Sequence, residues 1–183
     1  MIKKNFEKID EVIGLQYPNY AELNISNLDI KGSTNQYNNS QKILIVDNVD
    51  LLKEWTKVYC LSFGLSPDKE YLVYTILKKK FDIFNFVLSE VNVIGEIHKN
   101  AVGCCILFSY KNCIALYCLG TKKEHRRKNV ATNIVDFSIQ YGRKLGYPFF
   151  GLQTLQSDNL LSFYERRGFV KTYHNNIYGI INR

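Results

Sequence analysis

Apolar and polar residues recur with two different periods along the chain, and each period predicts its own set of elements. Alternation with period two, or a short continuous apolar run, predicts strands at 42–46, 84–93, 101–110, 113–121 and 147–153. Apolar residues spaced three and four apart predict helices at 49–64, 67–81, 130–145 and 158–167. Because the turns at 98–100 and 111–112 are short, the three strands that they join, 84–93, 101–110 and 113–121, are expected to form an antiparallel meander.

The N-terminal part of the chain is less regular. Residues 1–19 have a weak helical pattern, 21–26 alternates as a short strand does, and 32–40 is a polar, turn-rich loop. We therefore place an N-terminal extension or linker at 1–40 and the compact domain at 41–183. The extension has two interpretations: it adds a strand or a wall of a substrate pocket, or it is a partly ordered tail.

At the other end of the chain, the pattern predicts a final hairpin. Its strands are expected at 169–173 and 177–181, around Asn175 and Asn176, because asparagine accepts the positive φ of a tight turn. The complete order of strands and helices indicates an α/β (α+β) domain. Its single sheet is expected to carry helices on both faces.

Composition narrows the classes of protein to which the chain can belong. Apolar residues make up 46% and charged residues 22%, which is typical of a globular domain and excludes a disordered chain. The apolar runs are far shorter than the roughly 18 residues that span a bilayer, and the charged start is not typical of a signal peptide. The five cysteines are odd in number and lack a C-x-x-C pair, so we expect free thiols in a reducing cytoplasm and no metal site.

Positive charge is concentrated in one short segment. The net charge of +7 fits a nucleic acid, an anionic surface or a small polyanion such as a nucleotide. Five cations lie between 122 and 128, whereas Lys78, Lys79 and Lys80 end a predicted helix, where they complement the negative end of its dipole. The larger group gathers at one helix N-terminus and forms no stripe interleaved with aromatic residues, which disfavours nucleic acid as the partner.

The segment from Leu119 to Thr132 combines a strand end, a basic loop and a helix start. Such a turn directs free backbone N–H groups and the positive end of the helix at one place. The small residues Ala131 and Thr132 leave room there for a ligand. The arrangement suits a pyrophosphate group, and a solvated basic loop before an ordinary helix is the alternative.

Several short segments also carry a family resemblance. They are RRKNVA at 126–131, LQTLQS at 152–157, FYERRGF at 163–169 and the pair Val102-Gly103. Together they resemble motifs of the GNAT superfamily of acyl-CoA-dependent N-acyltransferases, over roughly residues 41–183. The resemblance implies a mixed, mostly antiparallel sheet. It also implies an N-acetyltransferase that uses acetyl-CoA and an amine acceptor, which is a small molecule or an amino-acid-like compound.

The resemblance further implies a role for each matching residue. Leu119 and Thr121 would pair through their backbones with the pantetheine arm beside Gly120, and Ser157 and Asn159 would contact that arm. The pyrophosphate and its surrounding charge would be held by Arg126, Arg127, Lys128, Asn129, Val130, Ala131 and Thr132. Tyr164 would protonate the leaving thiolate, because a tyrosine hydroxyl of pKa about 10 keeps its proton at pH 7. Packing of a helix onto the sheet is the alternative interpretation of Tyr164.

Two departures from the family pattern shape the remaining expectations. Asn129 stands where the family usually has glycine, and asparagine is the non-glycine residue that best tolerates left-handed backbone, so the loop is still expected to bind. The strand segment 114–118 lacks the carboxylate that many members place there, so no general base is assigned. Both departures favour the alternative of a non-catalytic acyl-CoA-binding module or sensor.

The acceptor itself is not identified by the sequence. The helices at 49–64 and 67–81 would border its pocket in this family. Their aromatic residues Trp55, Tyr59, Phe63 and Tyr74 either face that pocket or fill the core. The sequence also leaves the oligomeric state open.

Overall fold

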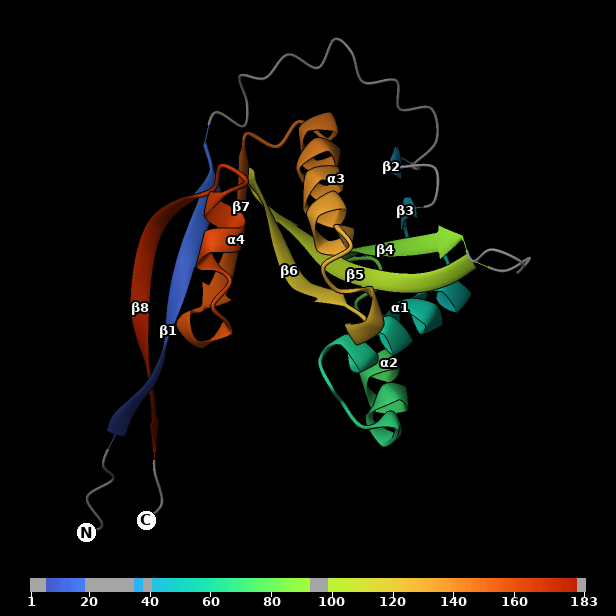
Figure 1. The fold of residues 1–183 in the computed structure, drawn as a ribbon, viewed down its shortest axis with the longest axis horizontal. Helices are drawn as coiled ribbons and strands as arrows, with labels where there is room; N and C mark the ends of the chain where they lie inside the picture. The colour runs from blue at the N-terminus through green and yellow to red at the C-terminus, as the bar shows by residue number, and fades with distance from the viewer. Residues whose placement is uncertain (1–5, 19–34, 38–40, 93–98, 181–183) are drawn as a thin grey trace.

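The computed structural model describes residues 6–18, 35–37, 41–92 and 99–180. Within these ranges the chain forms one eight-stranded sheet with helices on both of its faces (Figure 1). The strand order is β2-β3-β4-β5-β6-β7-β1-β8. This architecture confirms the expected single mixed sheet.

The elements follow one another as strands interrupted by single helices and helix pairs. The strands are β1 (Phe6–Tyr17), β2 (Asn35–Tyr37), β3 (Gln41–Ile45), β4 (Asn85–Asn92), β5 (Lys99–Tyr110), β6 (Cys113–Thr121), β7 (Phe149–Leu155) and β8 (Val170–Ile180). The helices are α1 (Val49–Ser62), α2 (Glu70–Lys78), α3 (Val130–Lys144) and α4 (Leu161–Glu165). Short 3-10 turns are η1 (Pro67–Lys69), η2 (Lys123–His125) and η3 (Gln156–Asp158).

Strand pairing is antiparallel everywhere except between β6 and β7. The strands β4, β5 and β6 form the predicted antiparallel meander, and β3 pairs antiparallel with β4 on its other side. The strand β7 then lies parallel to β6, because α3 carries the chain back across the sheet. On its other side β7 pairs with β1, and β1 pairs with β8.

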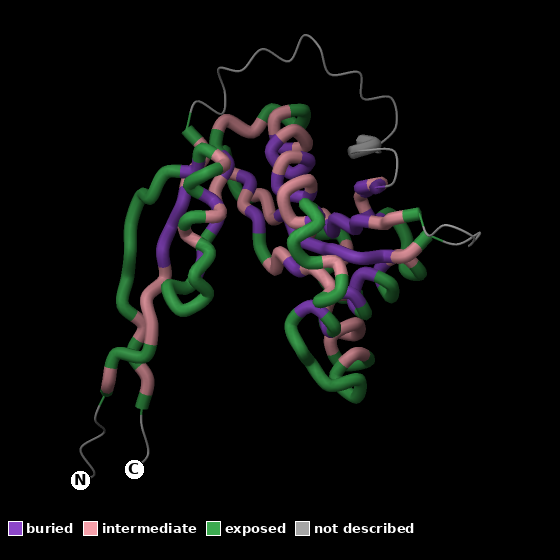
Figure 2. Tube along the Cα trace, viewed as in Figure 1, coloured by how far each residue is buried: buried purple, intermediate pink, exposed green. Residues whose placement is uncertain are grey.

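The two faces of the sheet are covered by two separate cores. Neighbouring residues of β4 point to opposite faces, as the pleat requires: Val87 packs under α3, and Phe86 and Leu88 pack under α1. The α3 side also includes Ile134 and Phe150, both fully buried. Figure 2 shows this burial along the strands and the inner side of α3, in contrast to β8, which is exposed along most of its length.

Two predictions at the ends of the chain are wrong. Residues 6–17, expected to be weakly helical, form the strand β1, because Ile13 and Leu15 are buried between β7 and β8. The predicted hairpin around Asn175 and Asn176 is one continuous strand. Those two residues pair with Val12 and Glu11 of β1, so no turn forms at them.

The rest of the N-terminal segment is described only in part. Residues 35–37, placed in a loop by the sequence, form the short strand β2 against β3. The short strand expected at 21–26 lies outside the described residues. The strand β1 therefore brings part of the first 40 residues into the same sheet as the rest of the chain. No helix within the described ranges is long and apolar enough to cross a membrane.

Candidate active site

The strands β6 and β7 separate halfway along their length. Their parallel pairing runs from Cys113 and Phe149 to Leu116 and Leu152 and ends there. Just beyond, Cys118 has a φ of 55° and the β5–β6 register shifts, which marks a bulge. A bulge bends its strand, and Figure 1 shows that β6 and β7 lie close at one end and diverge toward the other. The result is a gap in the middle of the sheet with unpaired strand edges on both sides.

A cavity of about 690 Å³ lies beside this gap, on the face covered by α3 and α4. Its walls come from the end of α1, the end of β6, the basic loop, the first turn of α3, and the segment from η3 to the residues after α4. The lining residues are Ser62, Phe63, Leu119, Gly120, Thr121, His125, Arg126, Arg127, Asn129, Val130, Ala131, Thr132, Asp158, Leu160, Phe163, Tyr164, Arg166 and Arg167.

The basic loop has an unusual backbone where it meets α3. Arg127 and Asn129 both have left-handed backbone, with φ of 60° and 62°. Asn129 is the N-cap of α3, yet its side chain makes no capping hydrogen bond. The N–H groups of the first helical turn, at Val130, Ala131 and Thr132, have no intrahelical acceptors. They and the positive end of the helix are therefore available to an anion. Asn129 thus adopts the backbone expected of glycine at that position.

Two of the lining arginines are held in place by hydrogen bonds. The Nη2 of Arg126 donates to the carbonyl of Ser62 at 2.9 Å. The Nη1 of Arg167 donates to the carbonyl of Phe163 at 2.9 Å, and its Nη2 donates to Oγ1 of Thr132. Arg167 also lies over the Phe163 ring, 3.9 Å from its centroid. These contacts fix two positive charges in the cavity wall.

Several polar atoms of the wall are buried without a partner. Within the described part of the chain, Oγ of Ser62, Oγ1 of Thr121 and Nε of Arg167 have no hydrogen-bond partner. All three residues line the same cavity. Because buried polar groups are almost always hydrogen-bonded, these atoms are available to a polar ligand or to water in the cavity.

Tyr164 lies in the cavity wall next to the core. It is 4% exposed and packs edge to face against Phe163 and Phe169. Burial raises the pKa of Tyr164 to about 12, because the apolar surroundings disfavour the charged phenolate. The hydroxyl therefore keeps its proton throughout the neutral range.

His125 lines the same cavity, and its pKa is shifted downward. Burial, followed by the charge of Lys128, lowers the pKa of the His125 ring, so the ring is neutral at pH 7.

A second cavity, of about 340 Å³, opens on the other side of the same gap. It lies on the opposite face of the sheet, since Ala115 and Tyr117 point away from the core that holds Ile114 and Leu116. Its lining residues are Leu15, Gln16, Cys113, Ala115, Tyr117, Phe149, Phe150, Gly151, Leu152, Gln153, Thr172 and Tyr173.

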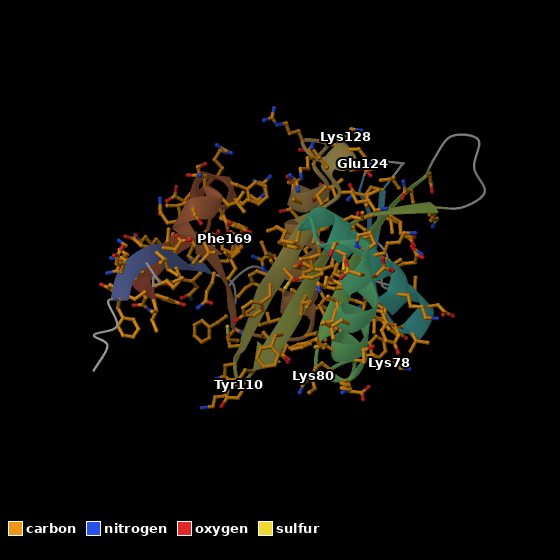
Figure 3. The ribbon with its side chains drawn as sticks, turned by 90° about the horizontal axis from the view of Figure 1, so that it is seen from below. Lys78, Lys80, Tyr110, Glu124, Lys128 and Phe169 are labelled. Atoms are coloured by element: carbon orange, nitrogen blue, oxygen red, sulfur yellow. The ribbon has the colours of Figure 1, made fainter. Side chains whose placement is uncertain are left out.

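Most of the residues predicted for the site meet at the larger cavity, and three do not. Those that line it are Leu119, Gly120, Thr121, Arg126, Arg127, Asn129, Val130, Ala131, Thr132 and Tyr164. Lys128 lies with Glu124 at the outer end of the loop (Figure 3). Ser157 is bound to β1 instead: its Oγ donates to Oδ2 of Asp10 at 2.5 Å. Asn159 donates from Nδ2 to the carbonyl of Ser157 at 3.1 Å.

The structure adds lining residues that sequence reasoning did not assign to the site. The most informative are Arg166 and Arg167, which follow α4, and Ser62 at the end of α1. The paired arginines before Gly168 were a visible signal, although they were interpreted only as a helix end. Ser62 gave no signal, because it reaches the cavity by packing across the sheet.

The aromatic residues of α1 and α2 divide between core and cavity. Trp55 is fully buried, and its Nε1 donates to the carbonyl of Cys105 at 3.1 Å. Tyr59 and Tyr74 pack against the same core. Phe63 lines the larger cavity. Lys78 and Lys80 lie at the opposite end of the molecule from Lys128 (Figure 3), so the second basic group is remote from the site.

The described ranges contain no group of three histidine, cysteine, aspartate or glutamate side chains that could hold a metal ion.

A family model described as the acetyltransferase (GNAT) family matches residues 52–169. A search of curated proteins found no match.

Solved structures with the same fold include three bacterial proteins. A GCN5-related N-acetyltransferase from Sphaerobacter thermophilus has a TM-score of 0.67 at 10% identity, over 94% of this chain and 52% of that protein. A GNAT-family acetyltransferase from Colwellia psychrerythraea has a TM-score of 0.62 at 10% identity, over 95% and 56%. A functionally unknown conserved protein from Staphylococcus epidermidis has a TM-score of 0.59 at 15% identity, over 92% and 60%. The chain thus spans little more than half the length of these proteins, and the likeness establishes the fold.

Proposed function

The chain belongs to the acetyltransferase (GNAT) family, and we propose that it transfers an acetyl group from acetyl-CoA to an amine acceptor. One observation carries this proposal: the larger cavity combines the open N-terminus of α3, fixed arginines and unpartnered buried polar atoms. A diphosphate supplies the many hydrogen-bond acceptors that such a site lacks. The five free thiols support a reducing, cytoplasmic location.

The diphosphate is assigned to the first turn of α3. The backbone N–H groups from Arg127 to Thr132 would donate to its oxygens, and Arg127 and Arg166 would neutralise its charge. The left-handed backbone at Arg127 and Asn129 directs consecutive N–H groups toward one side, which forms an anion-binding concavity.

The pantetheine arm is assigned to the gap between β6 and β7. Beyond Leu116 the edge of β6 has no β7 partner, so the backbones of Leu119 and Thr121 can pair with the amides of the arm as a strand would. Ser157 and Asn159 stay predicted contacts of the arm, although they lie outside the cavity lining.

The chemistry needs one nucleophile, one leaving group and two proton transfers. The amine nitrogen attacks the thioester carbonyl carbon, the C–S bond breaks, and the nitrogen loses a proton while the sulfur gains one. We assign the proton donor to Tyr164, whose burial keeps the hydroxyl neutral. The oxyanion would be stabilised by a backbone N–H near the bulge, at Leu119 or Gly120.

Calorimetric titration with acetyl-CoA and with CoA tests the cofactor assignment. Arg127 lines the cavity and Lys128 does not, so Arg127→Glu and Lys128→Glu form a matched pair with the same change in net charge. We expect micromolar binding by the wild type, about −8 kcal/mol. Arg127→Glu should weaken it at least about tenfold, and Lys128→Glu by much less. Equal effects of the two variants, or no binding by the wild type at millimolar ligand, would contradict the assignment.

Acyl-CoA binding without catalysis is the second candidate function. It is favoured by the composition of the smaller cavity, whose described lining contains no carboxylate or histidine that could serve as a base. This candidate predicts normal acetyl-CoA binding and no acetylated product with any amine. The proposed transferase predicts product, detected by mass spectrometry, and loss of that product in Tyr164→Phe.

A further inference from the structure

The smaller cavity has the position that an acceptor needs. Tyr117 and Gln153 line it, and each is the first residue after the last β6–β7 pair, Leu116 and Leu152. The larger cavity begins two residues further along β6, at Leu119, on the other face of the sheet. The two cavities therefore approach the same gap from opposite faces, which is how two substrates can meet without sharing a binding surface.

The floor of the smaller cavity is flat because its central residues are small. Ala115 and Gly151 are directly paired across β6 and β7, and both line the cavity. A Cβ atom on Gly151 would lie 3.2 Å from the carbonyl oxygen of Leu15. Larger side chains would fill this surface, so the small pair leaves a shallow, planar floor.

Two tyrosine side chains, Tyr117 and Tyr173, border this floor. Tyr117 and Tyr173 are 40% and 42% exposed, and both line the cavity. The Tyr173 ring packs directly over the backbone of Gly14, where a Cβ atom would lie 2.0 Å from the ring. Its hydroxyl oxygen accepts a hydrogen bond from Nε2 of Gln153. A planar ring between two tyrosine walls would gain favourable aromatic contacts.

The cavity is also uncharged. Among the described residues that line it there is no aspartate, glutamate, histidine, lysine or arginine. An ammonium group that entered it would gain no counter-ion from the lining. It would also meet no group able to remove its proton. The larger cavity differs sharply, since it is lined by four arginines, a histidine and an aspartate.

We infer that the smaller cavity binds an aromatic amine that is uncharged at neutral pH, with its ring on the Ala115–Gly151 floor between Tyr117 and Tyr173. This inference rests on the proposed acetyl transfer. An amine whose lone pair is delocalised into a ring is largely unprotonated at pH 7, so it can attack without a base. By contrast, only about 0.04% of a lysine-like amine is neutral at that pH.

The proton balance of this reaction closes without a carboxylate. The neutral arylamine attacks the thioester carbon and gives a tetrahedral intermediate with a positive nitrogen and a negative oxygen. The intermediate collapses, the C–S bond breaks, and the nitrogen passes its now acidic proton to water. The thiolate receives a proton from Tyr164, which water then restores. The products are an N-aryl acetamide and CoA.

A pair of isomeric amines tests the inference with the wild-type protein. 4-Methylaniline and benzylamine have the same atoms, but only benzylamine is an ammonium ion at neutral pH. We expect kcat/KM for 4-methylaniline to exceed that for benzylamine at least about tenfold at pH 7. Between pH 6 and 8 the value should stay flat for 4-methylaniline and rise about tenfold per pH unit for benzylamine. Faster acetylation of benzylamine, or of putrescine, would overturn the inference.

Two matched variants separate failure of the inference from failure of the proposed function. Ala115→Leu fills the floor of the smaller cavity and should lower kcat/KM for 4-methylaniline at least tenfold with calorimetric acetyl-CoA binding unchanged, which also shows that the variant folds. Ala131→Leu should weaken acetyl-CoA binding itself. No acetyl-CoA binding by the wild type would overturn the proposed function. Acetylation of benzylamine but not of 4-methylaniline, or an unchanged rate in Ala115→Leu, would overturn the inference alone, whereas acetyl-CoA binding without acetylation of either amine would overturn the proposed transfer as well.

Discussion

Arg126 donates a hydrogen bond from Nη2 to the carbonyl oxygen of Ser62, 64 residues earlier in the chain, at 2.9 Å. Its Nε donates to the carbonyl of Thr121 at 3.3 Å. The first arginine of the basic loop therefore joins the C-terminal end of α1 to the end of β6. A positive charge also suits the negative end of a helix dipole. Arg126 thus has a structural role besides the positive charge that it brings to the cavity.

Replacement of Arg126 should affect stability as well as binding. Arg126→Ala removes both hydrogen bonds, and we expect the free energy of unfolding to fall by about 1 kcal/mol. Acetyl-CoA affinity should fall too, because the loop is less well positioned. Lys128→Ala is the control, since Lys128 is exposed and outside the cavity, and it should change stability by less than about 0.5 kcal/mol. Chemical denaturation of both variants measures the difference, and equal stabilities would contradict this role.

Because Asn129 has left-handed backbone, stability and acetyl-CoA binding should depend strongly on which residue occupies this position. With φ at 62°, a β-branched side chain is strained, so Asn129→Val should lower the free energy of unfolding by about 1–3 kcal/mol and weaken acetyl-CoA binding. Asn129→Gly relieves that constraint and should bind at least as tightly as the wild type. Calorimetry on the two variants checks the order, and tighter binding by the valine variant would contradict it.

Gly103 allows the start of α3 to approach β5 closely. A Cβ at this position would lie 2.6 Å from Cγ1 of Val130 and 2.8 Å from Cδ1 of Ile134. We therefore expect Gly103→Ala to destabilise the protein by about 1–3 kcal/mol through overpacking. Combining it with Val130→Ala should recover part of the loss, because the clashing methyl is removed. Additive losses in the double variant, measured by thermal unfolding, would contradict this contact.

The raised pKa of Tyr164 predicts how the rate of acetyl transfer depends on pH above 8. Its pKa is raised to about 12, so the acid stays protonated well above the ordinary tyrosine value of about 10. The rate of acetyl transfer should therefore not fall between pH 8 and 10.5 through loss of this proton. Tyr164→Phe keeps the ring packing and should lower kcat about 100-fold or more with little change in acetyl-CoA affinity. A decline near pH 10 that the phenylalanine variant lacks would show that Tyr164 titrates normally.

The sequence predicted the elements that depend on local pattern. The strand at 113–121 has the bounds expected of it, and α3 begins at Val130 as its periodicity indicated. The left-handed preference of asparagine anticipated the backbone at Asn129. These features are set by residue type and spacing over a few positions, so they can be inferred without knowing the rest of the fold.

Features set by distant pairing could not be inferred. The strand β1 is interrupted by charged residues, and only its place between β7 and β8 makes Ile13 and Leu15 a buried strand. Ser157 bonds to Asp10, 147 positions away, which removes it from the cavity that its motif suggested. Ser62 likewise joins the cavity through the packing of α1 on β6. Each of these features depends on contacts between residues far apart in the sequence, which a local pattern does not predict.

A crystal structure with CoA is the most direct test of the central claim, that the gap between β6 and β7 beneath α3 is an acyl-CoA site. The account predicts the diphosphate within hydrogen-bond distance of the backbone N–H groups of Val130, Ala131 and Thr132, with the thiol between Leu119 and Tyr164. A CoA molecule bound elsewhere, or a saturated crystal without CoA in the gap, would contradict the account.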